Sequence, residues 1–109
     1  MKYNKYDLVL ANFPFTDLSK SKLRPAIVIK DLEGQNIILC LITTKKHSLG
    51  KYEIALKKQQ CEGDIRFDSF IYADLISTVH KSLVVRRIGK VIDENVKKSL
   101  SEKLSLLLS

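Results

Sequence analysis

The chain has 109 residues, enough for one domain, and none of its apolar runs approaches the ~20 residues needed to cross a bilayer. Nineteen Lys and Arg against 12 Asp and Glu give a net charge of +7, which favours a polyanionic partner such as nucleic acid. Residues 1–9 lack the continuous apolar segment of a signal peptide. We therefore expect a single cytoplasmic domain over residues 1–109.

The positive charge is concentrated in two segments. Residues 1–30 carry six basic and two acidic groups, and residues 45–60 carry five basic and one acidic group, whereas residues 61–80 are net acidic. A solvated, lysine-rich surface would show the same totals. No helix with a basic face and aromatic anchors is present, so a membrane surface is not favoured as the partner.

Two cysteines lie far apart in the chain. Cys40 is inside an apolar run, where a free thiol packs as a small core residue, and Cys61 is in a polar stretch. Two distant cysteines form neither a disulfide framework nor a zinc site. We expect two reduced thiols, no metal and no cofactor.

The first half of the chain is typical of short strands. Residues 7–12 are mostly apolar and predict a strand, and residues 13–23 predict a long loop because Pro, Ser and Asp interrupt them. Arg24 and Pro25 open the next strand, since proline is tolerated at a strand start. A turn at 33–36 and a strand at 37–43, buried on both faces, follow.

The second half predicts further strands and then a helix. A basic loop is expected at 44–51 and an irregular segment at 57–67. Strands are expected at 52–56, 69–75 and 83–88. Asp93 can cap a helix whose residues Val96, Leu100, Leu104 and Leu107 fall on one face. Several short strands and one terminal helix indicate a small, mainly β barrel capped by the helix.

Three segments resemble the MazF/PemK family of toxins, in the order that the family has them. They are DLVLANFPFTDL at 7–18 with KLRPAIVI at 22–29, then LITT at 41–44, then SFIYAD at 69–74 with VRRIGKV at 85–91. The resemblance covers nearly the whole chain. It departs from the family at Tyr6, where glycine is usual, and at Tyr72, where some members carry arginine.

The resemblance implies a small SH3-like (CcdB/PemK-like) barrel with a C-terminal helix, usually as a homodimer. The implied activity is that of a type II toxin, an mRNA interferase. Such an endoribonuclease cuts single-stranded RNA at selected sequences, without a metal, and leaves a 2′,3′-cyclic phosphate and a 5′-hydroxyl. The implied partners are single-stranded RNA or mRNA and a cognate antitoxin protein that covers the RNA groove.

Three residues are the candidate catalytic groups. Arg24 offers a planar guanidinium that can clamp phosphate oxygens and stabilise the transition state. Thr43, at the end of a buried strand, can hold the scissile phosphate, although packing alone would also select a β-branched residue there. Asp74 can act as the base, because the family sometimes uses a carboxylate there, or it can be an acceptor that shapes the groove.

Further residues are candidates for RNA binding. Phe15 can stack a base, Ser69 can donate to the backbone, and Thr44 shares the ambiguity of Thr43, since consecutive strand residues face opposite ways. Lysines in the two flanking loops can neutralise phosphates, and His47 lies among them. These loop residues are Lys20, Lys22, Lys45, Lys46 and Lys51.

Two alternatives remain on the same fold. Relatives of this fold poison gyrase without cutting RNA, and a family member can keep the barrel but lose catalysis. The basic loops and the pair of Arg24 and Thr43 favour RNA as the target.

Overall fold

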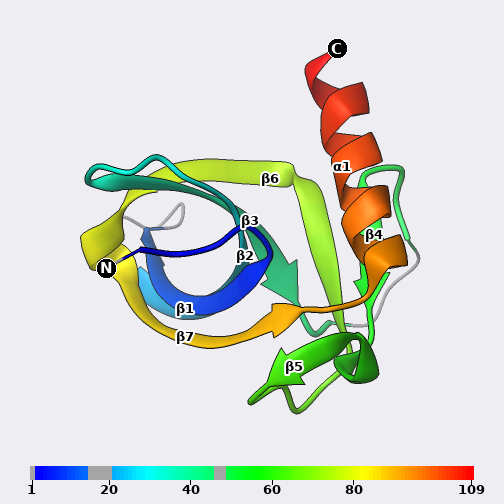
Figure 1. Cartoon of the computed structure of the whole chain (residues 1–109), viewed down its shortest axis with the longest axis horizontal. Coiled ribbons are helices and arrows are strands. Elements are labelled where there is room, and N and C mark those ends of the chain that lie inside the picture. Colours follow the sequence, from blue (N-terminus) through cyan, green and yellow to red (C-terminus); the bar gives the residue numbers. More distant parts are fainter. Residues whose placement is uncertain (1, 15–20, 46–48) are drawn as a thin grey trace.

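The chain is described by a computed structural model, which covers residues 2–14, 21–45 and 49–109. Within these residues, one antiparallel sheet has the strand order β4-β6-β3-β2-β1-β7-β5, and one α-helix follows it. The strands curve around into a small barrel, and α1 stands beside β4 (Figure 1). The elements are β1 (Asp7–Pro14), β2 (Ser21–Asp31), β3 (Asn36–Thr43), β4 (Glu53–Leu56), β5 (Cys61–Gly63), β6 (Ser69–His80), β7 (Val84–Val91) and α1 (Glu94–Leu108). The predicted mainly β fold with a C-terminal helix is confirmed.

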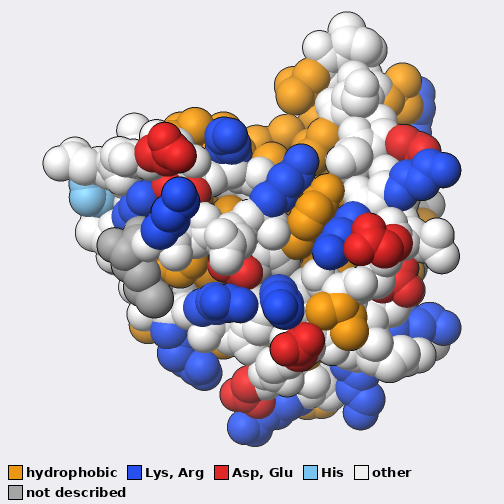
Figure 2. Space-filling view, viewed as in Figure 1, with side chains coloured by type: hydrophobic (Ala, Val, Ile, Leu, Met, Phe, Trp, Pro, Cys, Tyr) orange, Lys and Arg blue, Asp and Glu red, His pale blue; other side chains and the backbone are white. Residues whose placement is uncertain are grey.

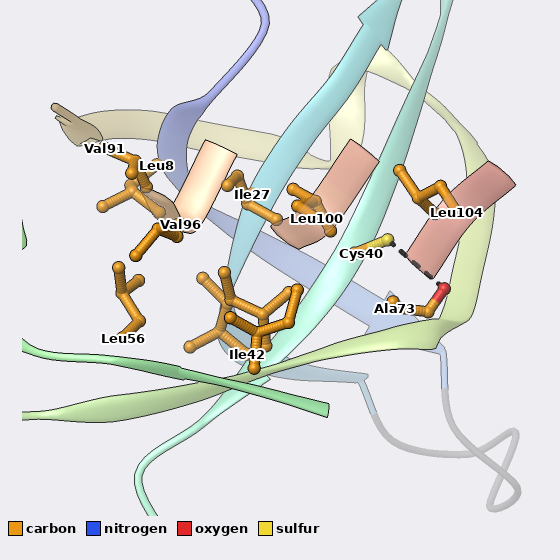
Figure 3. Packing of buried hydrophobic residues seen from close by; sticks show 12 residues of the cluster. Leu8, Ile27, Cys40, Ile42, Leu56, Ala73, Val91, Val96, Leu100 and Leu104 are labelled. Atoms are coloured by element: carbon orange, nitrogen blue, oxygen red, sulfur yellow. Dashed lines mark hydrogen bonds between the residues drawn. The ribbon is translucent and has the colours of Figure 1, made fainter. Parts of the chain in front are cut away.

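The central strands bury side chains on both of their faces. One face contributes to a helix-side core, which includes Leu8, Ile27, Cys40 and Ile42 together with apolar residues of α1 (Figure 3). The other face contributes to a barrel core, which consists of Tyr3, Val9, Ala11, Phe13, Ala26, Val28, Ile37 and Leu39. Because alternate residues of a strand face opposite ways, the near-continuous apolar run of β3 fills both cores.

Helix α1 begins and packs as its sequence predicts. The Asp93 carboxylate accepts a hydrogen bond from the Val96 backbone N–H at 3.0 Å, which satisfies one of the unpaired donors at the helix start. Val96, Leu100 and Leu104 are buried, and in Figure 3 they point into the helix-side core. Leu107 is only partly buried, so the predicted stripe weakens at its last member.

The expected loop at 13–23 was too long. Strand β1 continues to Pro14 and β2 begins at Ser21, and the pair forms a hairpin in which Phe13 lies opposite Lys22. Phe13, which was expected in the loop, is buried in the barrel core. Burial of this ring extends the strand past the point where proline and serine suggest that it ends.

The expected irregular segment at 57–67 contains two short elements. A single 3-10 turn spans Lys58–Gln60, and β5 pairs with β7 immediately afterwards. Strand β6 also extends beyond the predicted residue 75, to His80, with a break in its pairing to β3 between Ile71 and Ile76. Both elements depend on pairing with distant strands, which local apolar periodicity does not report.

Candidate nucleic-acid interface

Arg24 and Thr43 occupy facing positions near the same end of two neighbouring strands. Ala26 pairs with Leu41 in the antiparallel register of β2 and β3, so the next positions on the same face, two residues further on, bring Arg24 opposite Thr43. The hydrogen-bonded pairing of the two strands ends at Ala26 and Leu41, so Arg24 and Thr43 lie just beyond its paired part. The two predicted catalytic residues therefore lie together on one face of the sheet.

The row of residues that contains Arg24 and Thr43 continues onto β6. Thr43 pairs with Phe70, and on the same face Tyr72 pairs with Glu53 of strand β4. All five side chains alternate with residues of the helix-side core or the groove described below, so they share the opposite face. We call the face that carries Arg24, Thr43, Phe70, Tyr72 and Glu53 the Arg24 face.

The hydroxyl of Thr43 is held by the backbone that follows it. Its Oγ1 accepts a hydrogen bond from the Lys45 backbone N–H at 3.2 Å. This bond uses one acceptor position of the hydroxyl and restrains the side-chain torsion, while the O–H itself can still donate. Thr43 is therefore suited to donate to a phosphate oxygen beside Arg24.

Asp74 is not brought together with Arg24 and Thr43. It lies four residues beyond Phe70, roughly 13 Å at about 3.3 Å per residue, in the part of β6 where pairing to β3 is interrupted. Its side chain is exposed, and its charge acts on the Cys40 thiol. Burial, and after it the charge of Asp74, raises the pKa of Cys40 to about 12. The base role of Asp74 stays a prediction.

A groove lies on the opposite side of the same strand ends. It has a volume of about 400 Å³ and is lined by apolar side chains that include Leu10, Pro25 and Ile42. Thr44 and Ser69 also line it. Pro25 follows Arg24 in the chain, and Ile42 precedes Thr43. The groove and the Arg24 face therefore lie on opposite sides of the backbones of β2 and β3.

The two adjacent threonines therefore serve different surfaces. Thr43 belongs to the Arg24 face and exposed Thr44 to the groove, as the alternation of strand residues predicts. Ser69 is buried, and its hydroxyl donates to the Phe67 carbonyl at 3.4 Å. Ser69 is thus engaged within the protein at the groove wall.

The predicted binding residues in the loops are only partly described. Lys22, Lys45 and Lys51 are exposed, as expected of phosphate-neutralising groups. Four further predicted residues, Phe15, Lys20, Lys46 and His47, lie outside the described residues.

Sequence reasoning missed several residues at both surfaces. Arg66, Phe67 and Arg86 line the groove, and the Phe67 ring is 68% exposed. Arg66 and Phe67 stand in a net acidic stretch, so the charge pattern of the sequence did not single them out. On the face shown in Figure 2, Lys and Arg side chains are interspersed with Asp and Glu, so one continuous basic patch does not identify the interface.

Both cysteines are free thiols, as expected. Burial, and after it the charge of Asp68, raises the pKa of Cys61 to about 11. Over residues 2–14, 21–45 and 49–109, no group of three or more His, Cys, Asp or Glu side chains is placed to hold a metal ion. In the same part of the chain no helix is long and apolar enough to cross a membrane.

Comparison with known proteins places this arrangement in a family. Residues 4–108 match the family described as the PemK-like, MazF-like toxin of type II toxin–antitoxin systems. A search of curated proteins by sequence gives no match.

Solved structures of low sequence identity share the fold. The toxin MazF-mt6 of Mycobacterium tuberculosis is 17% identical with a TM-score of 0.72, over 94% of this chain and 95% of that chain. A mycobacterial endoribonuclease solved in complex with its cognate antitoxin is 12% identical with a TM-score of 0.75, over 98% and 95%. MazF of Deinococcus radiodurans is 18% identical with a TM-score of 0.75, over 97% and 96%. Because the family match spans almost the entire sequence, and the fold agrees with it, the chain belongs to the PemK-like, MazF-like toxins of type II toxin–antitoxin systems.

Proposed function

We propose that this toxin is an endoribonuclease that cuts single-stranded RNA at selected sequences without a metal ion. The observation that carries the proposal is the register of β2 and β3, which, continued two residues beyond Ala26 and Leu41, brings Arg24 and Thr43 onto one face. Family membership supports it, as do the related structures that are named endoribonucleases.

The proposed reaction uses the RNA's own 2′-hydroxyl as nucleophile on the adjacent phosphate. Arg24 binds two of the phosphate oxygens and stabilises the charge that develops on them, which fixed donors can do at a gain of roughly 10²–10³-fold each. Thr43 donates to the same phosphate and fixes its position. Lys22 and Lys45, exposed in the structure, contact neighbouring phosphates and steepen the salt dependence of binding.

The proposal extends to partners and compartment. Related structures are a MazE–MazF complex and an endoribonuclease with its cognate antitoxin, so we propose a cognate antitoxin protein for this chain as well. Like many of its family, the chain is proposed to act as a homodimer, and in the cytoplasm, where mRNA is found.

The test is cleavage of a long single-stranded RNA in EDTA, with every cut end mapped by sequencing. We expect cuts at one short recurring motif with 2′,3′-cyclic phosphate ends. Arg24→Ala should lower the rate by at least about 10²-fold, because the lost donor acts on the transition state. Lys98→Ala, which removes an exposed cation on α1, is the matched control and should leave the rate unchanged.

The alternatives make different predictions in the same assay. Intact RNA after incubation with folded protein, across many sequences, would reject the proposed ribonuclease activity. Gyrase inhibition or silent RNA binding would then be the remaining functions. The variant Asp74→Asn separately tests the base role predicted for that carboxylate. Cleavage that is abolished by EDTA would reject the metal-free reaction.

A further inference from the structure

We propose that the groove on the other side of the sheet from Arg24 binds one base of the single-stranded RNA, with the ring of Phe67 as its stacking platform. This inference rests on the proposed ribonuclease function and adds a second RNA-binding site to it. Its basis is an exposed aromatic ring and two arginines that line an apolar groove beside the ends of β2 and β3.

The ring of Phe67 is exposed, although the segment that carries it is held in place. The side chain is 68% exposed and adjoins the apolar wall of the groove. The Asp64 N–H donates to the Ile88 carbonyl at 2.8 Å, and the hydroxyl of buried Ser69 donates to the Phe67 carbonyl at 3.4 Å. The Asp68 carboxylate accepts a backbone N–H of the 3-10 turn at 2.9 Å. The ring is therefore a fixed part of a continuous apolar surface, which is typical of a binding site.

Two arginines add positive charge to this apolar surface. Arg66 and Arg86 both line the groove and are exposed, and Arg66 Nε lies 3.3 Å from Asp64 Oδ1, which restrains its guanidinium. Arg86 of β7 pairs with Leu10 of β1, whose side chain forms part of the apolar wall. A nucleotide has the complementary chemistry, because its base stacks on aromatic rings and its phosphate is an anion that arginine binds.

The size of the groove fits one nucleotide. Its volume of about 400 Å³ falls in the lower part of the range of about 300–1,000 Å³ that is usual for small-ligand sites. An α-helix of another protein, about 10–12 Å across with its side chains, needs a larger groove. The Thr44 hydroxyl also lines the groove, and it can donate to or accept from the edge of a base.

The groove lies within reach of RNA that is bound at Arg24. Thr43 and Thr44 are consecutive residues on the two surfaces, with Cα atoms about 3.8 Å apart. RNA whose scissile phosphate contacts Arg24 and Thr43 can therefore bend around the end of β3 and place a neighbouring nucleotide in the groove. Single strands allow this bend, because their bases unstack readily and then stack on aromatic side chains.

RNAs that lack a single base test whether Phe67 and a base are in contact. One oligonucleotide carries the mapped cut site with a 2′-deoxy nucleotide at the cut, so that it binds without being cleaved. A series of copies each lacks one base near the cut. Fluorescence anisotropy measures their affinities for the wild type, Phe67→Ala, Phe67→Tyr and the control Leu32→Ala. Leu32 is a matched control, since it is an exposed apolar residue that follows the far end of β2.

We expect the loss of one particular base to weaken binding to the wild type by about 5- to 100-fold, as for a lost stacking contact. Phe67→Ala should bind the intact RNA more weakly by a similar factor. It should lose no further affinity when that base is absent, because both changes remove the same contact. Phe67→Tyr keeps an aromatic ring and should match the wild type on every RNA, as should Leu32→Ala.

Other outcomes reject the site in identifiable ways. If the effects of Phe67→Ala and of base removal multiply at every position, the ring contacts none of these bases. If Phe67→Ala binds RNA normally but changes the mass of the RNA-free protein in sedimentation, the groove is a contact between two copies of the chain. A wild type that binds and cuts RNA alongside an unimpaired Phe67→Ala rejects this site alone. A wild type that neither binds nor cuts RNA rejects the proposed ribonuclease function itself.

Discussion

Replacing Tyr6 by glycine and by alanine should reveal strain in the backbone at this position. Tyr6 has a φ of 75°, in the left-handed region that costs a non-glycine residue roughly 1–2 kcal/mol. Its N–H donates to the Val28 carbonyl at 2.8 Å, and its carbonyl accepts from the Val91 N–H at 3.0 Å. Because both neighbouring strands hold this peptide, the backbone cannot relax by changing φ.

The tyrosine side chain offsets part of this strain. Its ring lies 5.3 Å from Lys5 Nζ and 5.4 Å from Lys97 Nζ, and each such contact at an exposed site contributes about 0.5–1 kcal/mol. Its hydroxyl also lies 3.3 Å from Ser101 Oγ. Both replacements lose these contacts, but only Tyr6→Gly relieves the strain. Glycine loses about 0.5–1 kcal/mol more than alanine in conformational entropy, which leaves Tyr6→Gly more stable than Tyr6→Ala by about 0.5–1 kcal/mol.

Urea unfolding of the two variants measures this difference. The two free energies of unfolding can be compared if they depend on urea concentration with the same slope. The control is Ala55→Gly in β4, an exposed position outside the residues with positive φ, where glycine should be less stable than alanine by about 0.5–1 kcal/mol. A Tyr6→Ala variant as stable as Tyr6→Gly would show that the backbone does not hold this φ.

Three further predictions concern stability. Leu100→Ala removes a fully buried side chain from the helix-side core and should cost about 2–5 kcal/mol in urea unfolding, whereas Leu108→Ala, at 75% exposure, should change stability by no more than about 0.5 kcal/mol. Gly89→Ala would bring its Cβ to 2.2 Å from a carbonyl oxygen of β5, so thermal unfolding should show a loss of roughly 1–3 kcal/mol. The hydrogen bond from Lys81, with two backbone N–H donors, holds the pKa of Asp31 well below its ordinary 3.8. Its stabilising effect should be complete above that ordinary value and be lost as the pH falls below it, so urea midpoints from pH 7 to pH 3 should fall more steeply for the wild type than for Asp31→Asn.

The sequence predicted best those parts of the fold that carry a regular or continuous apolar pattern. The helix was found because Val96, Leu100 and Leu104 recur at its period, and β3 because an apolar run fills two cores. Strand β5 could not be found this way, since it has three residues and none of them is fully buried. The second half of β6 carries exposed polar residues, and only its pairing with β3 makes it a strand.

The candidate site was predictable to a different extent at each residue. Resemblance to a family singled out Arg24 and Thr43, and the register of β2 and β3 brings them together. The resemblance marked Tyr72 only as a departure from the family, and the face of β6 that it occupies follows from the strand register. Arg66 and Phe67 were missed for a related reason, since they reach the groove from a segment whose net charge is negative.

The two surfaces depend on a single register between β2 and β3. Arg24 and Pro25 are neighbours that face opposite sides, and so are Thr43 and Thr44. A slip of one residue in either strand would therefore exchange a candidate catalytic side chain for a groove residue. The register is held by the buried pair of Ile27 and Cys40, which face the helix-side core with no exposed surface. A slip of one residue would turn these two side chains toward the barrel core. Their places in the helix-side core would be taken by side chains that normally face the other way. The apolar pattern that folds these strands is therefore also what places Arg24 and Thr43 on one face of the sheet.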